Sequence, residues 1–156
     1  MKEKKVEDFF REAGFDAVEN ECILVRYAPK NLSDAVKKFF YNKWLVLQVC
    51  RDSLIIANIV ADGLWALTLG KEDILEIPFS EIKNIDLEEA GFNYHLTIET
   101  LEDSLRFSIE QGELSNWRSS GLITTPLGIG LNKNNWHKHN IDRTLDALKE
   151  LKKKLA

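Results

Sequence analysis

The spacing of apolar residues changes at Lys43, and this change constrains the fold more than any other feature of the sequence. Before Lys43 the apolar residues recur mainly at helical spacing, and after it they alternate with polar residues as far as Ile109. Alternation with a period of two is typical of strands that bury one face. The sequence therefore predicts an α-rich N-terminal extension, residues 1–42, and a β-rich domain, residues 43–156.

The N-terminal extension contains two predicted helices and one predicted strand. Residues 4–13 have the spacing of an amphipathic helix, and Gly14 is a typical stop signal after them. Residues 33–41 predict a second helix, because Ser33 is a favourable N-cap and the apolar residues that follow share one side. Residues 21–28 alternate and predict a strand.

Seven short strands and one helix are predicted in the domain that follows. The strands span residues 44–50, 53–60, 64–69, 74–79, 82–88, 94–100 and 104–109. Asp62-Gly63 is the strongest hairpin signal, because both central positions of a type I′ turn need positive φ. Residues 140–155 predict a C-terminal helix with one apolar stripe. Short, closely spaced strands indicate an antiparallel sandwich or barrel, which makes the chain an α+β protein.

Three stretches resemble a known family. They are residues 43–47 (KWLVL), residues 74–85 (ILEIPFSEIKNI) and residues 96–100 (LTIET), and together they resemble the bacterial pleckstrin-homology (PH) and GRAM-like domains. The resemblance covers residues 43–155. It implies a PH-like seven-stranded antiparallel barrel or sandwich whose open end is capped by the C-terminal helix. Because the family has no universally required catalytic or binding residue, the resemblance implies a fold and no specific activity.

The charge of the chain excludes some classes of function and is unevenly placed. A formal net charge of -4 argues against a nucleic-acid binder and against a polybasic membrane anchor. Residues 71–113 carry 12 acidic against 3 basic side chains, whereas residues 114–156 carry 8 basic against 3 acidic ones. Such charges are usually solvated surface, and the alternative is that two oppositely charged faces meet complementary partners.

The cysteines and the hydrophobic runs indicate where the protein is located. Cys22 and Cys50 are too few for a disulfide framework and lack zinc-site spacing, so both are predicted to be buried thiols. The N-terminus has no apolar core of a signal peptide, and no apolar run reaches the roughly 18 residues of a membrane span. A cytoplasmic protein is therefore expected.

No catalytic, cofactor-binding or metal-binding residue is predicted, and the chain is not expected to be an enzyme. His95 lies in the middle of a predicted strand, where a solvent-facing histidine is the usual case. His137 and His139 lie where the last helix begins, and residues two apart on a helix point to different sides. The sequence has no nucleophile elbow, phosphate-binding loop or dinucleotide fingerprint.

Partner recognition by a non-catalytic binding module is the function that the sequence favours. Trp117 lies beside Arg118 in a glycine-bearing loop, residues 111–135, and Trp and Arg are enriched at protein interfaces. These two residues are the predicted partner contacts, although Trp117 would serve equally to anchor the loop. We expect the partner to be another protein, and an exposed sheet edge would also permit a homo-oligomer.

Two other functions stay open. Lipid binding would use basic residues between the first two strands, and the predicted turn there offers Arg51 beside Asp52, with Lys43 at the far end of the strand. This charge is sparse, so weak or no membrane association is expected. Small-ligand binding, or an enzyme with a site assembled in space, has no positive sequence signal.

Overall fold

The computed structural model describes residues 3–27, 44–62, 66–91, 93–110 and 136–155. Its elements are α1 (Glu3–Glu12), β1 (Ala17–Tyr27), β2 (Trp44–Cys50), β3 (Ser53–Asp62), β4 (Ala66–Pro78), the 3-10 helix η1 (Phe79–Glu81), β5 (Ile82–Ala90), β6 (Asn93–Thr100), β7 (Ser104–Glu110) and α3 (Trp136–Leu155). The helices predicted at residues 4–13 and 140–155 are confirmed, and α3 begins four residues earlier than expected.

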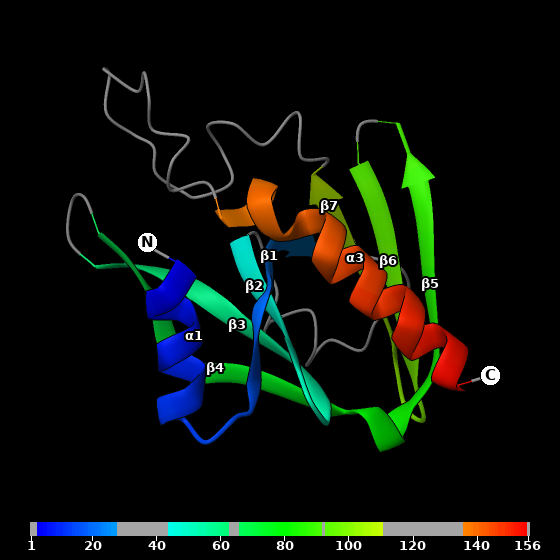
Figure 1. Cartoon of the computed structure of the whole chain (residues 1–156), viewed down its shortest axis with the longest axis horizontal. Coiled ribbons are helices and arrows are strands. Elements are labelled where there is room, and N and C mark those ends of the chain that lie inside the picture. Colours follow the sequence, from blue (N-terminus) through cyan, green and yellow to red (C-terminus); the bar gives the residue numbers. More distant parts are fainter. Residues whose placement is uncertain (1–2, 28–43, 63–65, 92, 111–135, 156) are drawn as a thin grey trace.

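The strands form one seven-stranded antiparallel sheet in the order β4-β3-β2-β1-β7-β6-β5 (Figure 1). β1 is the central strand, because it pairs with β2 along one edge and with β7 along the other. The α+β class and the antiparallel sheet with a C-terminal helix agree with the prediction from the sequence.

Eight strands were predicted, one in the extension and seven in the domain, whereas the described sheet has seven. Residues 64–69 and 74–79 were expected as two strands, but residues 66–69 and 74–78 belong to the single strand β4, and Phe79 begins η1. The β3–β4 register moves from Ala57↔Ile74 to Ile59↔Leu69, so residues 70–73 form a bulge opposite Asn58. The polar residues that resemble a turn are therefore extra residues within one strand. The seventh strand is β1, which lies in the predicted extension.

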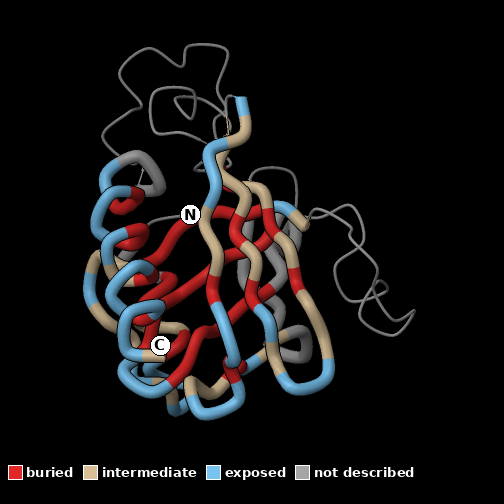
Figure 2. Tube along the Cα trace, turned by 90° about the vertical axis from the view of Figure 1, so that its right-hand side faces the viewer, coloured by how far each residue is buried: buried red, intermediate tan, exposed pale blue. Residues whose placement is uncertain are grey.

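The main core lies between the inner face of the sheet and α3. Its buried residues are Ile23, Val25, Leu45, Leu47, Val49, Leu54, Ile56, Ile77, Ile82, Ile85, Leu96, Ile98, Leu105, Phe107, Ile109, Ile141, Leu145, Leu148 and Leu151. Every strand of the sheet and the apolar stripe of α3 contribute to this cluster. Figure 2 shows these segments as the buried interior of the molecule.

A second, smaller core lies on the opposite face, where α1 packs on the first three strands. Its members are Val6, Phe10, Cys22, Leu24, Val46, Cys50, Ile55 and Ala57. The middle of the sheet is thus buried on both faces, which explains its nearly continuous apolar runs. Both cysteines are free and buried, as predicted.

Some predicted features lie outside the described residues, namely the helix over residues 33–41, the loop over residues 111–135, and Gly63 of the Asp62-Gly63 turn. Asp62 pairs with Ala66, so β3 and β4 are adjacent at the expected turn. Pro78 is the last residue of β4, a strand at the end of the sheet order, where a missing backbone donor is tolerated. Within the described ranges, neither helix is long and apolar enough to cross a membrane.

Candidate functional site

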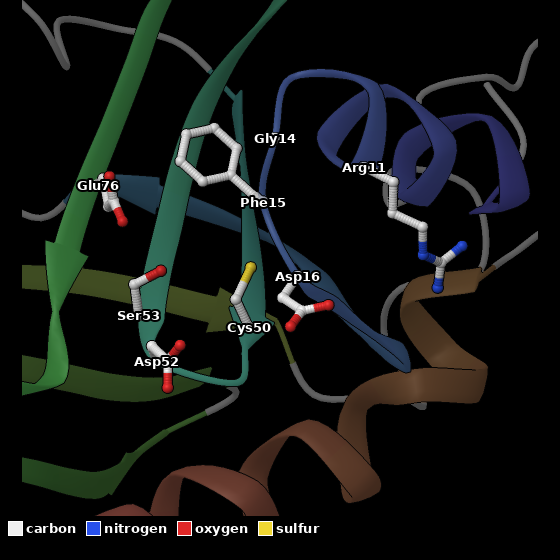
Figure 3. A pocket seen from close by; sticks show the side chains of 8 residues that line it. All are labelled: Arg11, Gly14, Phe15, Asp16, Cys50, Asp52, Ser53 and Glu76. Atoms are coloured by element: carbon white, nitrogen blue, oxygen red, sulfur yellow. The ribbon is translucent and has the colours of Figure 1, made fainter.

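Two hollows lie on either side of the turn between β2 and β3. The first, which we call the α1-side cleft, has a volume of about 480 Å³ (Figure 3). It is lined by Arg11, Gly14, Phe15, Asp16, Cys50, Asp52, Ser53 and Glu76. The second, the α3-side groove, has a volume of about 330 Å³ and is bounded by β1, the end of β2, η1 and the C-terminal half of α3. Cys50 contributes to both hollows.

The wall of the α1-side cleft is set by the way α1 ends. Gly14 has φ +95°, a left-handed conformation that suits glycine after the last helical turn. The Phe15 amide donates to the Phe10 carbonyl at 2.9 Å and closes this turn. The Arg51 amide then donates to the Asp16 carbonyl at 3.2 Å. Phe15 and Asp16 are therefore held beside the β2–β3 turn, where Figure 3 shows them.

The charge of the α1-side cleft is mostly acidic. The Arg11 guanidinium lies 3.7 Å from Glu7 and 3.6 Å from Asp8 on its own helix, so its charge is already balanced. Asp16 lies 3.9 Å from the Arg51 guanidinium at the rim. Asp52 and Glu76 have no cation within ion-pair distance in the described part of the chain.

The Cys50 thiol in the floor of the α1-side cleft is a poor nucleophile. Burial raises the pKa of Cys50 to about 12, a hydrogen bond with Ser53 opposes this shift, and the nearby Glu76 and Asp16 carboxylates add to it. The thiol therefore stays protonated at neutral pH, whereas attack and metal binding need the thiolate. Among the described residues, no three His, Cys, Asp or Glu side chains are grouped to hold a metal ion.

The α3-side groove owes its shape to a bulge in β1. Residues 18–21 lie between the register pairs Ala17↔Cys50 and Cys22↔Gln48, so four residues of β1 face one of β2. The fully buried Gln48 fills this irregularity, because its side-chain amide donates to the Val18 carbonyl at 2.9 Å and to the Glu21 carbonyl at 3.3 Å. Bulges often shape sites at sheet ends.

One carboxylate of the α3-side groove is paired across the fold. The Glu21 carboxylate lies 3.6 Å from the Arg143 guanidinium of α3, and the Glu21 side chain is only 14% exposed. Burial raises the pKa of Glu21, while the charge of Arg143 and its hydrogen bond lower it. The negative charge of Glu21 is therefore countered from within the protein.

The strand β5 forms one end of the sheet order. Within the described ranges it pairs with β6 alone, so its other edge has no strand beside it (Figure 1). Lys83, Glu88 and Glu89 are exposed on this strand. Asp86 lies 3.4 Å from the Lys152 ammonium of α3, which places the end of that helix beside β5.

Several residues singled out in the sequence can now be placed, and others cannot. Trp117 and Arg118, the predicted partner contacts, lie outside the described residues. Arg51 does not lie between the first two strands, because β1 precedes β2 and Arg51 follows β2. His95 is half-buried in the middle of β6, opposite Glu88 on β5.

Neither of the two groups that shape the α3-side groove, Gln48 and Glu21, was predicted from the sequence. The available signal was a lone amide in the run Leu45 to Cys50, since a polar residue inside a buried strand needs partners.

Comparison of the chain with protein-family models, with curated proteins and with solved structures found no match.

Proposed function

We propose that this chain is a PH-like domain acting as a non-catalytic module that recognises another protein by adding an extended segment of that protein to β5. The PH-like assignment is supported by the residues quoted for the resemblance. It is also supported by the antiparallel order β4-β3-β2-β1-β7-β6-β5 with a C-terminal helix packed on the inner face. This is the arrangement that the family resemblance implies.

The observation that carries the proposed function is the edge of β5 that pairs with no strand among the described residues. β5 has nine residues, about the length of an extended peptide that a sheet edge can pair with. An edge strand presents unpaired backbone N–H and C=O groups, and another strand satisfies them without any change of fold. α3 ends beside this edge, so side chains of an added strand would meet both β5 and the helix.

The charge on β5 favours a basic partner over a second copy of the same chain. Glu88 and Glu89 are exposed near one end of the strand, while Lys83 is exposed near the other. Acidic side chains on an edge repel a like-charged strand and attract Lys and Arg. We therefore expect an extended segment with basic residues that face Glu88 and Glu89.

The test is a selection of peptides from a random display library against the full chain, followed by NMR. Selected peptides should be enriched in Lys or Arg. Titration of the ¹⁵N-labelled protein with a selected peptide should shift the amide signals of β5 and slow their exchange with solvent. Shifts confined to other strands, or a selection that yields no binding peptide, would overturn the proposal.

A pair of charge variants makes the test specific. Glu88→Lys combined with Glu89→Lys should lower the affinity for the selected peptide by roughly tenfold. The reason is that both side chains would then repel the basic residues of the peptide at a partly shielded edge. Glu102→Lys is the matched control, since Glu102 is exposed in the β6–β7 turn and lies off β5. Equal losses in both variants would indicate a general charge effect and contradict recognition at β5.

A further inference from the structure

The α3-side groove combines an apolar lining, continuous with the main core, with a charged rim. Its apolar lining comes from Val18, Val49, Phe79, Ala147 and Leu151. The volume of about 330 Å³ lies at the lower end of the range of small-molecule sites. Such sites are mostly apolar, with a few polar groups that orient the ligand.

Two carboxylates and two cations line the groove, and neither cation pairs with either carboxylate. Of its two carboxylates, Glu21 is paired with Arg143 at 3.6 Å, and Glu150 is paired with Lys153 at 3.0 Å. Lys154 lines the groove and has no carboxylate within ion-pair distance in the described part of the chain.

The second rim cation, Arg51, has a partner outside the groove. It is 76% exposed on its side chain and lies 3.9 Å from Asp16, a residue of the α1-side cleft. An exposed pair at this distance is weak, so the Arg51 guanidinium can turn toward a ligand at little cost. The groove therefore joins an apolar floor to two cations whose charge is not neutralised inside it.

We infer that the α3-side groove binds a small monocarboxylate with an apolar body, the body against Val18, Phe79 and Leu151 and the carboxylate beside Lys154 and Arg51. Burial of the apolar body supplies the affinity. The rim cations select the anion over a neutral or cationic head group. No residue of β5 lines this site, and the inference does not depend on the function proposed for that strand.

Three probes with the same apolar body and different head groups test this inference, namely octanoate, octanol and octylammonium. Each is titrated into the ¹⁵N-labelled full chain. Octanoate should shift the amide signals of Val18, Ala147 and Leu151 and bind about fivefold more tightly than octanol, with octylammonium weakest. Equal affinities for octanoate and octanol would overturn the role of the cations. Absence of groove shifts with octanoate would overturn the site.

Variants of α3 test the two halves of the site separately. Lys154→Glu should lower the affinity for octanoate about fivefold or more, because the charge at this position of the rim is reversed. The variant should then bind octylammonium more tightly than octanoate. Lys149→Glu is the matched control, since Lys149 is exposed on the same helix and does not line the groove. Equal effects of the two variants on octanoate would overturn the assignment of Lys154.

A substitution that fills the groove tests the apolar half. Ala147→Phe should abolish binding of all three probes, because Ala147 lines the groove and a phenyl ring would occupy its volume. The thermal midpoint of the variant, read by circular dichroism, shows whether the chain still folds. A folded Ala147→Phe chain that binds octanoate with unchanged affinity would overturn the site.

Discussion

Substitution of Gln48 by Met removes the side-chain amide that holds the bulge of β1. This amide donates to the carbonyls of Val18 at 2.9 Å, Glu21 at 3.3 Å and Val49 at 2.8 Å. A buried carbonyl that loses its donor costs about 1 to 3 kcal/mol, at the lower end where it is partly buried. Met nearly matches the shape and also removes the Gln48 Oε1 atom, which is buried without a hydrogen-bond partner. Removal of this unpaired oxygen offsets about 1 kcal/mol of the cost of the lost hydrogen bonds.

At about 1 kcal/mol for each of the three carbonyls, less the offset from the removed oxygen, the net loss for Gln48→Met is about 2 kcal/mol in the free energy of unfolding. For a domain of this size, that loss lowers the thermal midpoint by about 4 to 8 °C. The assay is urea unfolding followed by tryptophan fluorescence, with the thermal midpoint from circular dichroism. Gln48→Glu serves as a second variant, because it keeps the shape but replaces the donor by an acceptor. If both variants unfold at the wild-type midpoints, the amide does not hold the bulge and the reasoning fails.

Three further predictions concern buried groups. Thr144→Val should leave the free energy of unfolding unchanged or raise it by up to about 1 kcal/mol, because the Thr144 hydroxyl is buried without a hydrogen-bond partner. A clearly lower free energy of unfolding in urea would contradict this prediction. Because the pKa of Cys50 is raised to about 12 in the folded chain, the thiol ionises at lower pH in the unfolded chain. The free energy of unfolding should therefore fall as pH rises above about 9, and it should fall less steeply in Cys50→Ala. Urea midpoints measured across this pH range test the prediction. Phe10→Ala should cost about 3 to 5 kcal/mol and Phe9→Ala less, because Phe10 is fully buried and Phe9 is partly buried; equal losses would contradict the packing of α1 on the sheet.

Periodicity predicted most of the fold, because each strand with one buried face alternates. The alternation over residues 104–109 places Leu105, Phe107 and Ile109 on one face of β7, and all three are buried in the main core. The same rule misled at residues 70–73, because a bulge and a turn use the same polar residues and differ only in what lies opposite them. Pairing between strands is not visible in a local pattern.

The place of β1 shows the same limit. A strand was predicted over residues 21–28, and residues 21–27 do lie in β1. The neighbours of β1, β2 and β7, are defined by contacts between distant parts of the chain. The candidate site was less predictable than the fold. Gln48 and Glu21 act through a bulge that forms only when β1 meets β2. Trp117 was selected for its residue type and its place beside Arg118 in a predicted loop, and it lies outside the described residues.

The central position of β1 has a consequence for how the chain folds during synthesis. β1 joins β7 through Arg26↔Ser108 and Tyr27↔Phe107, residues 80 or more positions apart, and loops of that length close slowly. The ribosome makes β1 before the other strands of the sheet, yet its second neighbour, β7, is the last of them to emerge. Until then the apolar run Cys22 to Val25, which is covered on both faces in the finished protein, stays open to wrong partners. We expect nascent chains stalled before β7 to bind chaperones through this strand.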